Sequence, residues 1–175
     1  MSRPASGTYN PSFGLYIDKV KESDLHDAFR NQQNILDNFF ENIPEEKHNY
    51  AYAPGKWTLK EMLQHLIDSE RIFNYRSLCF ARQETVSLPG FEENLYAENS
   101  NASTRTWQSL VDEFKVVRKS TIYLYESFTR EMLHFVGTAN DNPATALALA
   151  YATVGHVYHH VYIIETRYLQ QTESC

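Results

Sequence analysis

Apolar side chains recur in four segments of the chain at alternating steps of three and four residues, the spacing that gives an α-helix one apolar face. The most regular segment carries the series Trp107, Leu110, Phe114, Val117, Thr121, Leu124 and Phe128. An earlier segment follows Ser23 or Asp24, either of which can cap a helix. It is interrupted at Pro44, because proline breaks a helix. The pattern therefore predicts amphipathic helices.

Capping signals place the starts of the next two helices. Thr58 followed three residues later by Glu61 forms a capping box, which predicts a second helix over about 58–82. The third helix is expected to begin near Ser103 or Thr104, just before the regular apolar series.

The last apolar segment follows a break in the pattern over 137–142. Asn142 is the expected cap of this fourth helix and Pro143 its first residue, because proline is well tolerated at that position. The helix should run to about Leu169. No segment shows the strict alternation that is typical of strands. Four amphipathic helices predict an all-α fold, a four-helix bundle.

Two stretches lie outside this helical pattern. Residues 1–20 are rich in Ser, Pro, Gly and Tyr and are expected to form an extended N-terminal lead-in to one bundle domain over 21–172. Residues 84–103 contain Pro89-Gly90 and many polar side chains, which predicts a long loop. Such a loop either covers a functional site or is a plain solvated connection.

The composition excludes several classes of protein. Hydrophobic residues make up 42% and the net charge is −6, which favours a globular protein and argues against nucleic acid as the main partner. No stretch approaches the roughly eighteen apolar residues of a membrane-spanning helix, and the first residues lack a signal-peptide core. Cys79 and Cys175 do not make a disulfide framework. We therefore expect a cytoplasmic protein without a membrane segment.

Three histidines are the candidates for chemistry. His156 and His160 are four residues apart and therefore project from one face of the fourth helix, one turn apart. His65 lies on the interior stripe of the second helix and can supply a third imidazole. Three such ligands leave a tetrahedral divalent ion one open position. The alternative is that these histidines only form hydrogen bonds in the core.

Other polar residues near these histidines have two interpretations each. Glu61 is either a fourth ligand or the partner of Thr58 in the capping box. His159 flanks the pair, either supporting a ligand or facing solvent. The arginines of the second helix, Arg71, Arg76 and Arg82, either bind an anion or form a charged face that pairs with neighbouring acids. Three further histidines are expected at the surface or in local hydrogen bonds: His26, His48 and His134.

Several motifs together resemble the DinB-like superfamily over roughly residues 25–170. They are Ala53-Pro54-Gly55-Lys56-Trp57-Thr58-Leu59-Lys60-Glu61, His65-Leu66-Ile67-Asp68-Ser69-Glu70-Arg71, Tyr75-Arg76, Phe80-Ala81-Arg82, Leu88-Pro89-Gly90-Phe91 and the pair His156 and His160. The resemblance implies a four-helix bundle with a divalent ion, nickel or zinc, held by His65, His156 and His160. It also implies relatives such as bacillithiol S-transferases and mycothiol-dependent maleylpyruvate isomerase, which use the metal to hold a low-molecular-weight thiol as thiolate.

Two functions from different classes follow. The first is a metal-dependent enzyme, a thiol-dependent S-transferase or a hydrolase, in which the ion activates a thiol or water against a small-molecule electrophile. In it, Arg76 or Arg82 holds a carboxylate of the thiol cofactor, and Phe91 and Tyr96 form an apolar wall of the cavity. The alternative is a non-catalytic bundle that is stabilised by a metal or senses one.

The aromatic content predicts self-association. The chain has 12 Tyr and 10 Phe, more than one bundle seam readily buries. Large apolar patches on the surface of a globular chain usually mark an interface, so we expect a homodimer.

Overall fold

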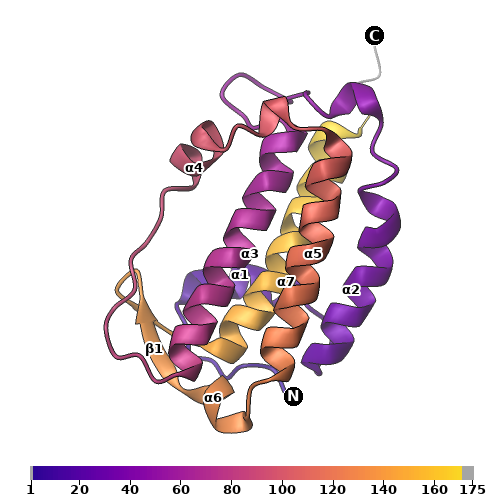
Figure 1. Cartoon of the computed structure of the whole chain (residues 1–175). Helices are drawn as coiled ribbons and strands as arrows, with labels where there is room; N and C mark the ends of the chain where they lie inside the picture. The colour runs from indigo at the N-terminus through magenta and orange to yellow at the C-terminus, as the bar shows by residue number, and fades with distance from the viewer. Residues whose placement is uncertain (1, 171–175) are drawn as a thin grey trace.

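The computed structural model of the protein describes residues 2–170, and within them four long helices form a bundle (Figure 1). These helices are α2 (Leu25–Phe39), α3 (Leu59–Ala81), α5 (Trp107–Glu126) and α7 (Ala146–Ile163). A short π-helix over Ile164–Tyr168 continues α7. The predicted all-α four-helix bundle is confirmed. Residues 171–175, with Cys175 and the end of the predicted domain, lie outside the described residues.

Polar side chains cap the first three long helices close to the predicted positions. Asp24 accepts hydrogen bonds from two backbone N–H groups in the first turn of α2. The predicted capping box is present, with the Thr58 N–H donating to Glu61 Oε2 at 2.7 Å and the Glu61 N–H donating to Thr58 Oγ1 at 3.2 Å. α5 starts slightly later than predicted, with Thr106 as its N-cap.

The predicted start of the fourth helix at Asn142 and Pro143 is wrong. Both residues lie in β2 (Asn142–Thr145), which pairs antiparallel with β1 (Val136–Ala139). Proline is tolerated there because both strands of a two-stranded sheet are edge strands. Thr145 is the N-cap of α7, and its hydroxyl accepts a hydrogen bond from the Ala148 N–H.

The hairpin closes one end of the bundle beneath α3 and α7, after the short helix α6 (Arg130–His134) (Figure 1). Asn140 and Asp141 connect the strands with φ of 50° and 57°, as a two-residue hairpin turn requires. Leu88 from the long loop joins β1, with its N–H donating to Thr138 O at 2.9 Å. The loop is therefore anchored to the hairpin by backbone hydrogen bonds.

The segment predicted as a long loop contains helical turns. Its middle forms α4 (Glu93–Asn99), which packs against α3 (Figure 1), and its end forms a 3-10 turn over Ala102–Thr104. A further 3-10 turn over Glu45–Lys47 follows α2. Over residues 2–170, no helix combines the length and the apolar composition needed to cross a membrane.

The N-terminal lead-in departs from the expected extended conformation. Residues Pro11–Phe13 form a 3-10 turn, and α1 (Gly14–Ile17) follows it directly. Asn10 caps this short helical segment by accepting a hydrogen bond from the Ser12 N–H at 2.9 Å. Its residue Ile17 is buried in the core, so the lead-in is part of the packed molecule.

α7 is the central helix and is buried around most of its circumference. Its alternate small residues, Ala146, Ala148, Ala150 and Ala152, are fully buried. The neighbours of α7 include α1, α2 and α3. α1 approaches it closely at Gly155, where an added Cβ would lie 1.9 Å from the carbonyl oxygen of Tyr16. Because Gly155 has no side chain, Tyr16 can lie beside the histidines of α7.

A buried polar network fixes how the four long helices sit against one another. Arg118 of α5 donates from Nε and Nη2 to the two carboxylate oxygens of Glu70 on α3, at 2.8 Å each. Its Nη1 donates to Gln32 Oε1 of α2 at 2.5 Å. The Gln32 amide in turn donates to the Val154 carbonyl of α7 at 2.7 Å. Because every member is paired, this network specifies one alignment of the bundle.

Candidate metal centre

α3 and α7 bring the three predicted histidines together. His156 Nε2 lies 3.1 Å from His65 Nε2 and 3.0 Å from His160 Nε2. One ring nitrogen from each of the three residues lies within 4.8 Å of the others. His156 and His160 reach this point because they are one turn apart on α7, and His65 meets them from the facing helix.

Aromatic side chains enclose the three imidazoles. His65, His156 and His160 are only 6%, 6% and 8% exposed. The Trp57 ring packs on His65 with 4.7 Å between ring centroids, and the Tyr16 ring meets His156 edge-on at 5.0 Å. The centre therefore lies in an environment from which most water is excluded.

Burial keeps all three histidines neutral. It lowers the pKa of His65 from its ordinary 6.5 to about 4 and that of His160 to about 3. The pKa of His156 is also lowered well below its ordinary value, first by burial and then by the neighbouring histidines. Neutral imidazole is the form that binds a metal ion, so the trio is ready to coordinate at neutral pH.

The hydrogen bonding of the trio is incomplete without a cation. His65 Nδ1 faces Ser69 Oγ at 3.5 Å, whereas His160 Nδ1 is buried without a partner among the described residues. Because His156 Nε2 carries either one proton or one lone pair, it would have to share that single site between both Nε2 neighbours. A cation among the three Nε2 atoms would accept all three of their lone pairs, while His160 Nδ1 would still have no partner among the described residues. The donor set thus fits a divalent transition metal with open positions.

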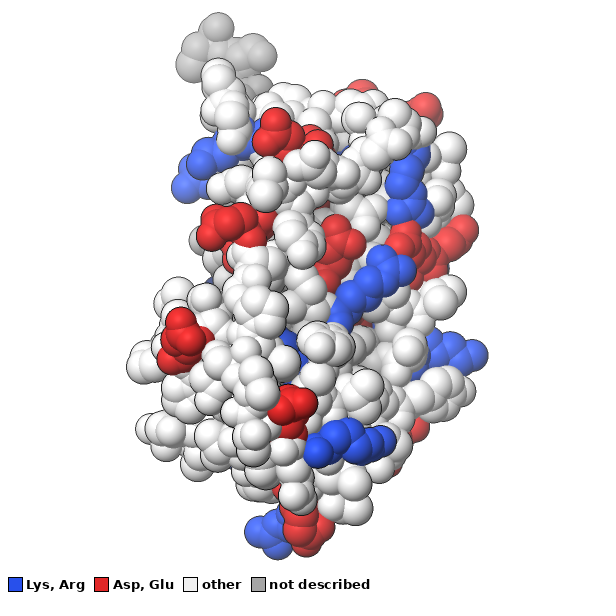
Figure 2. Space-filling model, turned by 60° about the vertical axis from the view of Figure 1, so that its left-hand side comes forward, with Lys and Arg blue, Asp and Glu red and all other residues white. Residues whose placement is uncertain are grey.

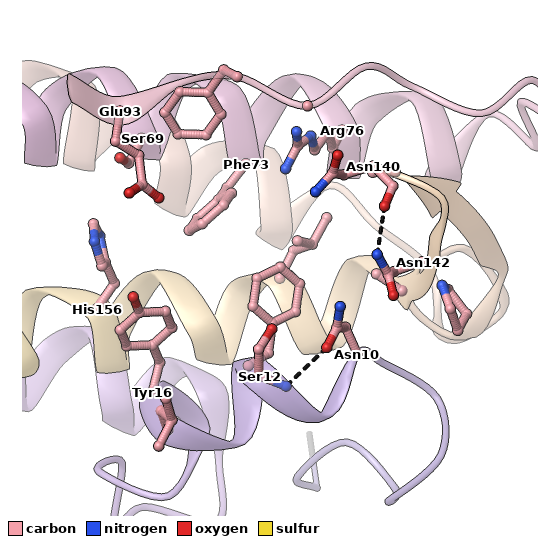
Figure 3. Close-up of a pocket in the computed structure, with 18 residues that line it drawn as sticks. Asn10, Ser12, Tyr16, Ser69, Phe73, Arg76, Glu93, Asn140, Asn142 and His156 are labelled. Atoms are coloured by element: carbon pink, nitrogen blue, oxygen red, sulfur yellow. Dashed lines mark hydrogen bonds between the residues drawn. The ribbon is translucent and has the colours of Figure 1, made fainter. Parts of the chain in front are cut away.

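Two cavities reach the centre, which can therefore be approached by small molecules. The first cavity, about 260 Å³, is lined by His156, Tyr16 and Glu93 and continues along α3 to Arg76. The second cavity, about 230 Å³, is lined by His160, Trp57 and Tyr168 among other residues. In the first cavity the Glu93 carboxylate, the Tyr16 hydroxyl and the His156 imidazole point toward one region (Figure 3).

The other polar candidates take different roles. Glu61 is held by Thr58 in the capping box and is not part of the histidine cluster. His159 is half-buried, and its ring lies 5.1 Å from the His160 ring and 5.5 Å from the Tyr16 ring. His48 stacks on Trp107, and the rings of His26 and His134 are on exposed residues.

The structure separates the three arginines of α3. Arg71 forms a salt bridge with Glu113 at 2.6 Å, as the charged-face interpretation predicts. Arg76 is buried and lines the first cavity, whereas Arg82 is exposed and does not line it. Phe91 lines the first cavity, while Tyr96 only packs on Phe91 at 5.2 Å between ring centroids.

Sequence reasoning missed the contribution of the N-terminal segment and of α4. Asn10, Ser12 and Tyr16 line the first cavity although they precede the bundle, and Glu93 enters it from the long loop. One signal was available, because Asn10 followed by Pro11 is a helix start. Nothing in the local pattern indicates that this turn packs on α7.

Acidic and basic side chains are interspersed over the face of the molecule drawn in Figure 2. That face therefore carries no extended area of one charge sign.

Known proteins provide an independent comparison. The model of the DinB superfamily matches residues 28–164. Among solved structures, YfiT from Bacillus subtilis superposes with a TM-score of 0.69 at 16% identity, over 93% of this chain and 89% of YfiT. YfiT is described as a probable metal-dependent hydrolase with an unusual four-helix bundle topology. At this identity the likeness shows a shared fold. No curated protein matches the chain.

Proposed function

Because the chain belongs to the DinB superfamily, we propose that it is a metal-dependent enzyme whose divalent ion, nickel or zinc, is held by His65, His156 and His160. The observation that carries the proposal is the convergence of three buried, neutral imidazoles, of which His156 lines one cavity and His160 lines another. The description of YfiT as a probable metal-dependent hydrolase supports the same class of chemistry.

When bound, the ion supplies Lewis acidity and lowers the pKa of a coordinated thiol or water. The chain supplies the surroundings. Glu93 offers a carboxylate at the same end of the cavity as His156 and can accept the proton released by the nucleophile. Phe73 and Phe91 give the cavity apolar walls that exclude water from the reacting bond. The reaction is then transfer of a thiol to a small-molecule electrophile, or hydrolysis where water is the nucleophile.

Metal content tests the ligand set. His65→Ala, His156→Ala and His160→Ala should each weaken binding of nickel or zinc at least about tenfold, because each removes one of three ligands. Elemental analysis and calorimetric titration of the purified variants measure this loss. His26→Ala, at an exposed position, is the control and should bind like the unchanged protein. Stoichiometric metal in all three ligand variants would contradict the assignment.

A thiol screen tests the reaction. Metal-loaded protein is incubated with low-molecular-weight thiols and a chloroarene or epoxide, and with simple esters and amides in the absence of thiol. Activity should fall to background in His160→Ala, and Glu93→Gln should slow turnover while keeping the metal. Turnover in the thiol arm identifies a transferase and turnover in the other arm a hydrolase. Full metal occupancy without turnover in either arm favours the metal-stabilised or metal-sensing bundle.

A further inference from the structure

Arg76 is a buried cation that has no counter-ion in the described part of the chain. Its side chain belongs to a residue that is 6% exposed, and burial lowers the pKa of its guanidinium. Among residues 2–170 no carboxylate forms a salt bridge with it. Its contacts are one hydrogen bond from Nη2 to the Pro89 carbonyl at 2.8 Å and the Phe91 ring, 5.9 Å away. Buried charges are normally paired, so this one calls for a partner.

The guanidinium lies beside the first cavity, at the side away from His156 (Figure 3). Three asparagines, Asn10, Asn140 and Asn142, line the same side of the cavity. The amide of Asn142 already donates one hydrogen bond to the Asn140 carbonyl, which leaves it a second N–H, and the amide N–H groups of Asn10 and Asn140 can also donate to a ligand. The hydrogen bond to Pro89 leaves other N–H groups of Arg76 for a ligand. We propose that Arg76 and these amides form a binding site for the carboxylate of the substrate.

The charges of the cavity favour a monoanion. Arg76 is the one Lys or Arg among the described residues that line it, and Glu93 brings a negative charge to the opposite side. A single guanidinium suits a planar carboxylate, which accepts two parallel hydrogen bonds. A phosphate group carries more charge and would need a second cation for comparable binding.

The cavity also limits the size and character of the substrate. Ser69, Phe73 and Arg76 lie on one face of α3, and at ~1.5 Å rise per residue Arg76 lies about 10 Å beyond Ser69. Between the two ends the wall is apolar, with Phe13, Phe73 and Leu149. The ligand is therefore a small acid with an apolar body between its carboxylate and its reacting atom. The placement of the reacting atom near the histidines rests on the proposed function, whereas the carboxylate site at Arg76 does not.

Calorimetric titration of metal-free protein tests the site without reference to activity. The probes are 4-phenylbutyrate, its uncharged amide and 3-phenylpropylphosphonate. The carboxylate should bind at least tenfold more tightly than either of the other two. Arg76→Met should lose this preference and bind the carboxylate at least tenfold more weakly. Arg82→Met, which changes an exposed arginine on the same helix, should bind the probes like the unchanged protein.

Thermal unfolding of the same variants shows whether weaker binding by Arg76→Met comes from a loss of folding. Arg76→Met removes an unpaired buried charge, so its melting temperature should equal or exceed that of the unchanged protein. Equal affinity of the unchanged protein for acid and amide overturns the proposal even if the variant fails to fold. Tighter binding of the phosphonate overturns the choice of a carboxylate. A carboxylate preference in protein that never binds metal leaves this site intact and refutes only the metal-dependent function.

Discussion

His65, His156 and His160 can be selected as candidate ligands from spacing because each depends on local geometry, and the structure places the three together. Two of them are four residues apart on one helix, and the third lies on the interior stripe of another. Arg76 shows where that reasoning stops. In the sequence it cannot be distinguished from Arg71 or Arg82, because burial and the absence of a counter-ion depend on which chain segments cover it.

The lowered pKa values of the three histidines predict how the metal-free protein responds to acid. Between about pH 6.5 and pH 4 the unfolded chain binds protons at these residues and the folded chain does not, so stability falls as the pH is lowered. The expected slope is about 1.4 kcal/mol per pH unit for each histidine that stays neutral. Urea unfolding at several pH values, with a chelator present, measures it.

His65→Gln is the control for this slope. Glutamine does not titrate, so the slope of unfolding free energy against pH should fall by the contribution of one histidine. Above about pH 7 the free energies of the two proteins should differ by an amount that does not depend on pH. Parallel curves for the two proteins would mean that His65 is not held neutral by folding.

At the scale of elements, the contact between α1 and α7 depends on Gly155, because a side chain there would collide with α1. Gly155→Ala would place a Cβ 1.9 Å from the Tyr16 carbonyl oxygen, so α1 must move away from α7. The expected cost is about 1–3 kcal/mol of unfolding free energy, as for other overpacked sites. Denaturant unfolding measures this cost, and nuclear magnetic resonance of the Tyr16 ring reports whether it leaves His156.

Gly14→Ala is the matched control within α1. An added Cβ there meets only the Asp18 carboxylate at 3.9 Å, and the backbone is helical. This variant should keep or slightly increase stability, because alanine favours a helix more than glycine does. A similar loss in both variants would mean that the loss at Gly155 reflects glycine replacement in general.

The elements themselves differ in how far the sequence determines them. The capping box at Thr58 and Glu61 locates α3 correctly because both partners are local. Asn142 and Pro143 give an equally good local signal for a helix start, yet pairing with β1 places them in a strand. The left-handed residues Asn140 and Asp141 are the signal for this hairpin. The packing of α1 at Gly155 involves residues about 140 positions apart, which no local pattern contains.

At the scale of the whole molecule, we propose that the protein forms a homodimer. Several aromatic and aliphatic side chains remain on the surface, among them Tyr75 and Leu78 on one face of α3 and Tyr123 on α5, which are 58%, 39% and 62% exposed. Light scattering at micromolar concentration should give twice the chain mass of 20.4 kDa. Tyr75→Asp should shift the mass toward the monomer, and Tyr162→Asp on α7 tests a different face. A monomer for the unchanged protein would refute the proposal.

α4 contributes residues to both cavities. Its neighbouring residues Glu93 and Asn94 line the first and the second cavity respectively. A displacement of α4 would therefore change the lining of both cavities at the same time. If movement of α4 admits the substrate, both cavities change together, and turnover cannot exceed the rate at which α4 separates from α3.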